Sequence, residues 1–399
     1  MKSKLLVYDS FYSGHHREYV EHLLRHWTAD AGVIFVVHPK LIAEINNIGL
    51  IHHFELVALP QVLADQLETA TNHKEHLAIE REYLLEIAQQ YQPAEWLWLF
   101  MDPYRTFLGS RPFREWGIRH RGILFMNQLY VPWNLGYLRQ QLAYRLKLWL
   151  LLRNPAVEEV YILNDQQGSQ RLNKKYRTSR FSFLTDPILI VDTFGLDQAA
   201  DQAELRTALG WSKDRKIALL FGAISERKNA LGCLKAASCL PPALRANTCL
   251  VIHASSIRSP HKEQLNSLIA EINENYPELE VRFERGRLTD QELAHRIAAS
   301  DLILAPYRHF YSSSGVMNCA IRHAKPFVAS ERGLMAVLAR EYGVGQLVDP
   351  NDFEQMAAAW EEGFKEETLP LENCERYINE RSAEEFASIL GKQKLSVGA

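Results

Sequence analysis

The sequence predicts an α/β protein made of two successive doubly wound units, each built on a parallel sheet. Short apolar runs alternate with stretches of helical periodicity, and the alternation stops once, near residues 184–187, before it resumes. Strands of a parallel sheet are covered by helices on both faces, so they read as short continuous apolar runs. A chain of 399 residues leaves about 180 to 210 residues for each unit, an ordinary domain size.

The first half begins with a strand, a loop and a helix. Residues 5–8 form a short apolar run, and apolar side chains between Tyr19 and Trp27 recur at helical spacing. A long helix is expected over 62–91, with charged residues such as Glu80 on its outer face. Further strands are expected at 33–37, 54–59, 96–100, 123–126 and 160–163.

The second half repeats this alternation. Strands are expected at 217–221, 249–252, 281–283, 302–304 and 327–329, and helices over 230–238, 262–274, 290–299 and 315–324. The polar stretch before Pro187 suits a linker between the halves. We therefore expect an N-terminal domain over 1–184, a C-terminal domain over 185–372, and a helix within 373–399 that packs back toward the N-terminal domain.

Composition narrows the classes of function. The net charge is −3, whereas a generic nucleic-acid binder is strongly basic. No apolar run approaches the roughly 18–20 residues of a membrane span, and the first apolar stretch is too short for a signal peptide. The five cysteines have no CxxC spacing, which argues against a zinc site or a disulfide framework. We expect a cytoplasmic protein with reduced thiols and no nucleic-acid partner.

Loops at the carboxyl ends of parallel strands carry the ligand sites of open α/β sheets, and two such loops of the first half are candidates. Gly14 follows the first strand and lets a ligand approach the backbone, while His15 and His16 are suited to act as a base or to bind a hydroxyl. A tight turn with two solvated histidines explains these residues about equally well. Asp102 follows the strand at 96–100 and is suited to orient or deprotonate a substrate hydroxyl. An Asp-Pro turn is at least as good an explanation.

A third candidate loop runs from Gly222 to Asn229 and leads into a helix. It carries the adjacent cations Arg227 and Lys228, which suit a phosphate because their charges add to the dipole of the helix N-terminus. A solvated charged turn is the simpler explanation for a run of this kind.

The fourth candidate loop spans 307–318 and also opens a helix. Ser313, Ser314 and Gly315 stand where that helix begins, and free backbone N–H groups at such a place can bind an anion. N-capping explains one serine but not three serines followed by a glycine.

Four segments of the second half resemble the GT-B glycosyltransferases, particularly the family-4 nucleotide-sugar transferases. Residues 222–228 resemble the strand-loop segment in which a lysine shortly after a glycine binds the donor diphosphate. The segments SDLILAP at 300–306, NCAIRHAKPFVAS at 318–330 and GVGQLVDP at 343–350 resemble three further motifs, in the family's order and spacing. In the first half, only the layout and Gly14 support the resemblance.

The resemblance implies two Rossmann-like domains that face a cleft, with the donor bound by the C-terminal domain and the acceptor by the N-terminal domain. It implies no cofactor and no obligatory metal. The donor-binding candidates are then Gly222, Arg227, Lys228, Ser313, Ser314, Gly315 and Asn318. The candidate for acceptor binding is Gly14, and the catalytic candidates are His15, His16 and Asp102.

The sequence also departs from the family in the fourth loop. Family members usually carry two glutamates eight positions apart, which contact the donor sugar and the ribose, whereas Phe310 and Asn318 stand at the matching positions. Asn318 is still able to hydrogen-bond a ribose hydroxyl, but Phe310 is unable to replace a carboxylate. An arginine often follows the first glycine; here that residue is Ala223, and Arg227 is the available substitute.

The resulting interpretation is transfer of a sugar from a nucleotide-diphosphate sugar to an acceptor hydroxyl, on a lipid-linked or cell-surface glycan precursor. Two alternatives stay open. A nucleotide-sugar 2-epimerase on the same fold needs no acceptor, so products formed from the donor alone would reveal it. A non-catalytic nucleotide- or sugar-binding protein is suggested by the missing glutamates.

The segment 104–153 is strongly basic within a nearly neutral chain. It holds nine cations and a single acid, Glu115, with tryptophans and tyrosines interleaved, and 138–152 reads as a basic, apolar helix. This pattern is typical of a helix that lies on an anionic membrane, and it would place the protein at the inner face of that membrane. A core helix with arginines solvated at its edge explains the segment slightly better.

Overall fold

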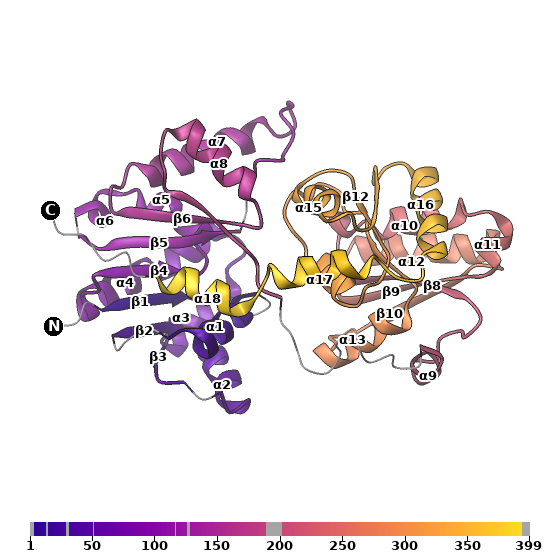
Figure 1. The fold of residues 1–399 in the computed structure, drawn as a ribbon, viewed down its shortest axis with the longest axis horizontal. Coiled ribbons are helices and arrows are strands. Elements are labelled where there is room, and N and C mark those ends of the chain that lie inside the picture. The colour runs from indigo at the N-terminus through magenta and orange to yellow at the C-terminus, as the bar shows by residue number, and fades with distance from the viewer. Residues whose placement is uncertain are drawn as a thin grey trace. The chain divides into compact units, whose positions relative to one another are not determined.

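The computed structural model describes residues 4–12, 15–28, 32–50, 52–115, 117–125, 128–188 and 202–392. The chain divides into two compact units, Met1–Leu189 with Arg381–Ala399, and Ile190–Glu380. Each unit has one parallel sheet flanked by helices (Figure 1). This architecture confirms the predicted α/β fold with two Rossmann-like units.

The N-terminal unit contains a seven-stranded sheet of order β3-β2-β1-β4-β5-β6-β7. Strand β1 pairs in parallel with both β2 and β4, so the strand order reverses between β1 and β4. The last strand, β7, falls outside the predicted set, because FSFL is short and interrupted by a serine. The strands are β1 (Leu5–Asp9), β2 (Val33–Val37), β3 (Glu55–Ala58), β4 (Glu95–Trp98), β5 (Arg119–Leu124), β6 (Val157–Leu163) and β7 (Phe181–Leu184).

The helices of this unit correct one prediction made from the sequence. The single helix expected over 62–91 is two helices, because the side chain of Asn72 accepts the backbone N–H groups of Lys74 and Glu75 and starts a new helix there. The helices are α1 (His15–His26), α2 (Pro39–Asn47), α3 (Gln61–Thr69), α4 (His73–Tyr91), η1 (Asp102–Tyr104), α5 (Arg105–Leu108), α6 (Arg111–Glu115), α7 (Leu138–Leu152), α8 (Gln166–Tyr176) and α18 (Ala383–Gly391).

The core of the N-terminal unit lies on both faces of its sheet. Successive side chains of β1 point to opposite faces, so Leu6 packs in a cluster with α4 while Val7 packs in a second cluster with α1. The second cluster also contains Phe386 of α18, whose ring centroid lies 4.8 Å from that of Tyr19. The last helix of the chain is therefore part of the core of the first unit.

The C-terminal unit contains a six-stranded sheet of order β10-β9-β8-β11-β12-β13, which reverses between β8 and β11. Its strands are β8 (Lys216–Ile224), β9 (Thr248–Ile257), β10 (Glu280–Arg285), β11 (Leu302–Ala305), β12 (Phe327–Ser330) and β13 (Gln346–Val348). Its helices are α9 (Gln202–Ala208), η2 (Glu226–Lys228), α10 (Ala230–Ser238), α11 (Pro242–Ala246), α12 (His261–Asn275), α13 (Asp290–Ala299), α14 (Gly315–Arg322), α15 (Leu334–Tyr342), α16 (Phe353–Lys365) and α17 (Leu371–Asn379).

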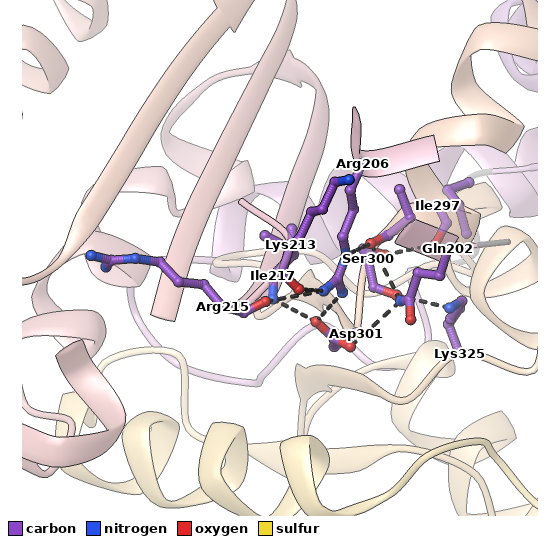
Figure 2. Close-up of polar contacts among 10 residues, drawn as sticks. Gln202, Arg206, Lys213, Arg215, Ile217, Ile297, Ser300, Asp301 and Lys325 are labelled. Carbon is purple, nitrogen blue, oxygen red and sulfur yellow. Dashed lines mark hydrogen bonds and ion pairs between the residues drawn. The ribbon is translucent and has the colours of Figure 1, made fainter. Parts of the chain in front are cut away.

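Two of the motif segments in this unit serve the fold. Asp301 accepts hydrogen bonds from the guanidinium of Arg206 and from the backbone N–H of Ile217, both at 2.6 Å (Figure 2). Lys325 donates to the carbonyl oxygen of Ser300 at 2.8 Å in the same network. These contacts join α9, the start of β8 and the start of β11, at the amino ends of the strands. They lie away from the carboxyl ends, where ligands of such sheets bind.

Candidate functional site

Each sheet reverses its strand order once, and the loops that leave the carboxyl ends of the strands at that point form the expected ligand site. In the C-terminal unit these loops follow β8 and β11. In the N-terminal unit they follow β1 and β4. Each of these places holds residues that the sequence singled out.

Lys228 is the central residue of the candidate site in the C-terminal unit, formed by the loops after β8 and β11. Its side chain is only 6% exposed, and its Nζ donates a hydrogen bond to the hydroxyl of Tyr307 at 2.6 Å. Burial raises the pKa of the Tyr307 hydroxyl, and the side chain of Ser314 beside it opposes that rise. Tyr307, which the sequence did not distinguish, therefore joins the loop after β8 to the start of α14. The ammonium group and the helix N-terminus are brought together in this way.

Gly222 makes room for Lys228. Its φ of 111° is one that side-chain-bearing residues rarely adopt, and a Cβ there would lie 3.2 Å from Nζ of Lys228. The sequence singled out this glycine as part of a phosphate loop. The structure adds a specific reason for it, which is the close approach of the lysine.

Asn229 holds the strand-end loops in place. It adopts a left-handed backbone conformation with φ of 59°, and its side-chain amide donates to the carbonyl oxygens of Pro306 and Pro350 at 3.1 and 2.8 Å. These carbonyls follow β11 and β13, so one buried side chain ties three loops together. Sequence reasoning did not assign Asn229 a role, because its partners lie 77 and 121 residues away along the chain.

Arg227 is exposed and lies over aromatic rings. Its guanidinium carbon is 4.9 Å from the ring centroid of Phe310 and 5.6 Å from that of Tyr307. Phe310 stands where the resembling family has a glutamate, and here its ring contributes a cation–π contact to Arg227. The phenylalanine that replaces the family's glutamate therefore helps to hold the guanidinium of Arg227 at this site.

The start of α14 has the N-cap that the sequence offers as an explanation of its serines. The hydroxyl of Ser314 accepts the backbone N–H of Val316 at 3.3 Å, so N-capping is present. Gly315 is the first residue of the helix, and Ser313 is half-buried just before the cap. Asn318 accepts a hydrogen bond from the hydroxyl of Tyr377 in α17 at 2.7 Å, so its amide N–H groups are the atoms suited to meet a ligand.

The second place, in the N-terminal unit, contains a carboxylate–imidazole pair. Asp9 ends β1, and its Oδ2 lies 2.8 Å from Nδ1 of His16, while its Oδ1 accepts the backbone N–H of Phe11 at 3.0 Å. The carboxylate side chain is fully buried and the imidazole is 16% exposed. A carboxylate on Nδ1 holds the proton there and leaves Nε2 as the basic atom. Asp9 did not enter the predicted site, although the strand-end rule that selected Asp102 applies to it equally.

Aromatic rings fix the orientation of the His16 imidazole. Phe11 stacks on it with centroids 4.8 Å apart, Phe125 stacks at 5.8 Å, and Phe100 meets it edge-on at 5.1 Å. These rings come from the loops after β1, β4 and β5. The imidazole is thus held by rings from three loops while Asp9 holds its Nδ1.

The remaining predicted residues of this unit have different surroundings. Burial lowers the pKa of His15, but a hydrogen bond to Glu18 and the charge of Asp186 outweigh burial and raise that pKa to about 9. A histidine that is protonated at neutral pH is suited to donate a hydrogen bond and unsuited to accept a proton. Gly14 lies outside the described residues.

Asp102 is buried and already engaged. Its Oδ2 accepts the backbone N–H of Phe125 at 2.8 Å, and its Oδ1 lies 3.6 Å from the guanidinium of Arg105. The side chain has no exposed surface, and the residue begins the short helix η1. This geometry favours the structural explanation. Asp102 fixes the backbone of Phe125, whose ring stacks on His16.

A buried polar network supports the loop after β1 and corrects one prediction. Glu80 was expected on the outer face of its helix, but it is fully buried and accepts hydrogen bonds from the hydroxyls of Tyr8 and Tyr104 at 2.9 and 2.7 Å. Ser10 lies 2.9 Å from Nε2 of His76 in the same network. A buried carboxylate is tolerated here because several donors satisfy it.

Three further findings concern metals, thiols and membranes. Within the described ranges, no group of three or more histidine, cysteine, aspartate or glutamate side chains is placed to hold a metal ion. All five cysteines are free. In the part of the chain that the structure describes, no helix combines the length and the apolar character needed to cross a membrane.

Comparison with solved structures defines the fold class. WaaG, described as a glycosyltransferase involved in lipopolysaccharide biosynthesis, is similar over 99% of this chain and 100% of its own, with a TM-score of 0.65 and 18% identity. HepE of Anabaena, solved with UDP and glucose, is similar over 97% of this chain and 98% of its own, with a TM-score of 0.66 and 14% identity. Sucrose-phosphate synthase of Thermosynechococcus elongatus is similar over 98% of each chain, with a TM-score of 0.66 and 16% identity.

The chain therefore has the GT-B fold, as the sequence motifs predicted. Neither a protein-family model nor a curated protein sequence matches the chain. The narrower resemblance to family 4 stays a prediction.

Proposed function

We propose that the protein is a glycosyltransferase that moves a sugar from a nucleotide-diphosphate sugar to an acceptor hydroxyl. The observation that carries this proposal is the convergence of Lys228, Tyr307 and Ser314 beyond the carboxyl ends of the paired strands β8 and β11, between which the strand order reverses. A buried ammonium beside a helix N-terminus is an arrangement that stabilises phosphate oxygens. The GT-B fold supports the proposal, since WaaG is described as a glycosyltransferase and HepE was solved in complex with UDP-glucose.

In this proposal the domain over 185–372 binds the donor. Arg227, Lys228 and the backbone N–H groups of 313–315 stabilise the charge that develops on the diphosphate as the bond between it and the sugar breaks. Asn318 donates to a ribose hydroxyl. No metal ion is assigned a role, because two cations and a helix N-terminus already meet the diphosphate.

The domain over 1–184 binds the acceptor. Its hydroxyl loses a proton to Nε2 of His16 while the oxygen forms the new bond to the sugar, and Asp9 stabilises the imidazolium that results. His15 donates a hydrogen bond to the acceptor beside Gly14. We further propose a lipid-linked or cell-surface glycan precursor as the acceptor, and a cytoplasmic enzyme at the inner face of the membrane. WaaG supports this, because it acts in lipopolysaccharide biosynthesis.

A two-stage experiment tests the proposal. A thermal-unfolding screen with UDP, GDP and ADP comes first, because a ligand that binds only the folded state raises Tm. The nucleoside diphosphate that stabilises the protein then identifies the donor sugars to incubate with a panel of glycan acceptors. Acceptor-dependent release of nucleoside diphosphate is expected. Conversion of the donor alone would support the epimerase instead, and binding without any turnover would support a binding protein.

Donor binding should weaken as the pH rises through 7. Burial, followed by the charge of Arg227, lowers the pKa of Lys228 to about 7. The ammonium form therefore falls from about nine-tenths at pH 6 to about one-tenth at pH 8, and the Kd should rise about tenfold. UDP-glucose is the suitable probe, since its diphosphate does not titrate in this range, and calorimetry gives the Kd. Lys228→Met should abolish the dependence; a Kd of the parent protein that stays constant would contradict the lowered pKa.

A pair of substitutions at the start of α14 distinguishes a phosphate site from a simple cap. Ser314→Ala removes the capping hydroxyl and should cost about 1 kcal/mol of stability, but it leaves the backbone N–H groups in place. Gly315→Val adds a branched side chain where the phosphate would approach the backbone. We expect Gly315→Val to raise the Kd for UDP more than Ser314→Ala does. Normal UDP binding by both variants would show that the loop is only a helix cap.

A further inference from the structure

The outward face of α7 carries a stripe of exposed apolar side chains. Among the described residues, six of the nine large apolar side chains that are exposed by more than a third lie within 133–149. Leu135 is 91% exposed, and the others recur every three or four residues along one face of the helix. The α7 stripe consists of Leu138, Leu142, Leu146 and Trp149 of the helix, together with Leu135 just before it.

The other side of α7 is already used for packing. Tyr144, Leu148 and Leu151 are buried, and the helix packs against α5 at the outer margin of the N-terminal unit (Figure 1). α7 is therefore apolar on two sides, and a helix of this kind normally has neighbours on both. A core helix with solvated arginines explains the buried side and leaves the α7 stripe unexplained.

Cations border the α7 stripe. The guanidinium of Arg145 lies 3.7 Å from the ring centroid of Trp133, and that of Arg153 lies 4.7 Å from the ring centroid of Trp149. Arg139 and Lys147 are exposed on the same helix. Within the described part of the chain, none of these four cations forms an ion pair with an acid. The structure removes other cations of the segment from this set, since Arg105, Arg111, Arg119 and Arg121 pair with acids.

The neighbouring helix extends the positive surface. Burial, followed by the charge of Arg145, lowers the pKa of Lys175 in α8, so the two cations lie close enough to repel. Lys174, Arg177 and Arg180 line a shallow hollow at the end of α8. No acid occurs in the sequence between Glu115 and Glu158.

We infer that the α7 stripe docks on an anionic lipid surface, with its apolar side chains at the acyl boundary and its cations at the level of the headgroups. The charges favour lipid over a second copy of the chain. A symmetric contact between two copies would bring each stripe and its cations against the same cations of the other copy, with no acid to balance them. The biological meaning rests on the proposed function, because a bilayer is where a lipid-linked acceptor would be met.

Vesicle co-sedimentation tests the inference directly. The protein should bind vesicles of equal parts phosphatidylglycerol and phosphatidylcholine, bind phosphatidylcholine alone far more weakly, and dissociate as salt rises. Arg139→Gln combined with Lys147→Gln should weaken partitioning about 25-fold, since each cation near an anionic surface contributes about a factor of five. Leu142→Ser combined with Leu146→Ser should weaken it about tenfold or more. Val62→Ser, another exposed apolar residue of the same unit, serves as the matched control and should change nothing.

The outcomes separate this inference from the proposed function. Absence of vesicle binding at low salt, in protein that still binds UDP, would overturn the docking surface and leave the transferase proposal intact. Vesicle binding by a protein that binds no nucleotide would support the docking surface and contradict the transferase proposal. Light scattering that finds a dimer for the parent protein and a monomer for the leucine double variant would assign the α7 stripe to self-association and also overturn the inference. All variants are checked by thermal unfolding, so that loss of fold is recognised.

Discussion

His16→Ala is expected to lower turnover by about 10²- to 10⁴-fold, the usual contribution of a general base. Oδ2 of Asp9 lies 2.8 Å from Nδ1, and the rings of Phe11 and Phe125 stack on the imidazole, so the ring is already oriented in the free protein. Alanine removes the proton acceptor and leaves the strand and its loop in place. Steady-state kinetics measure the loss, and UDP affinity measured in parallel should stay unchanged.

Two further variants test whether the loss is specific to His16 and its carboxylate partner. Asp9→Asn removes the charge that stabilises the imidazolium, so it should lose much of the same factor while His16 is intact. His53→Ala, at an exposed histidine of the same unit, should keep full activity. A folded His16→Ala protein with the parent's turnover number would remove His16 from the chemistry.

Lys228→Ala is expected to weaken UDP binding by about 10- to 150-fold, because a charge-assisted hydrogen bond contributes roughly 1.5–3 kcal/mol. The lysine is 6% exposed, and its Nζ is held by a 2.6 Å hydrogen bond to the hydroxyl of Tyr307. Calorimetry measures the Kd, and donor turnover should fall in parallel.

Lys228→Met separates charge from volume, since methionine keeps most of the apolar stem. It should lose as much affinity as the alanine variant while retaining more of the parent's thermal stability. Lys235→Ala, at an exposed lysine of α10, is the matched control and should bind UDP normally. Undiminished UDP affinity in a folded Lys228→Met protein would place the diphosphate elsewhere.

Much of the fold could be predicted from the sequence because parallel strands leave a strong local signal. The apolar runs that became β1, β2, β8 and β11 are short, continuous and separated by helical periodicity. Where local signal was weak, prediction failed: FSFL of β7 is only four residues long and includes a serine, and the break between α3 and α4 depends on a single capping residue, Asn72.

The candidate site was predicted in part, for a related reason. The rule that ligands bind at strand ends selected Lys228, Ser314 and His16 from local sequence, and the structure places each at a strand-order reversal. It gave no weight to Tyr307 and Asn229, whose importance comes from partners distant in sequence. Glu80 was assigned to the wrong face for the same reason, because its donors Tyr8 and Tyr104 lie 72 and 24 residues away.

The position of α18 has a consequence for how the protein is made. Phe386, Ala387 and Leu390 are fully buried in the core of the N-terminal unit, although they follow the whole of the C-terminal unit in the chain. The N-terminal unit therefore cannot complete its core until residues 190–380 and α18 after them have been synthesised. The C-terminal unit, whose residues are all released earlier, can fold before it. Synthesis thus reverses the order in which the two units mature, and a premature stop before residue 381 would leave apolar side chains of α1 uncovered.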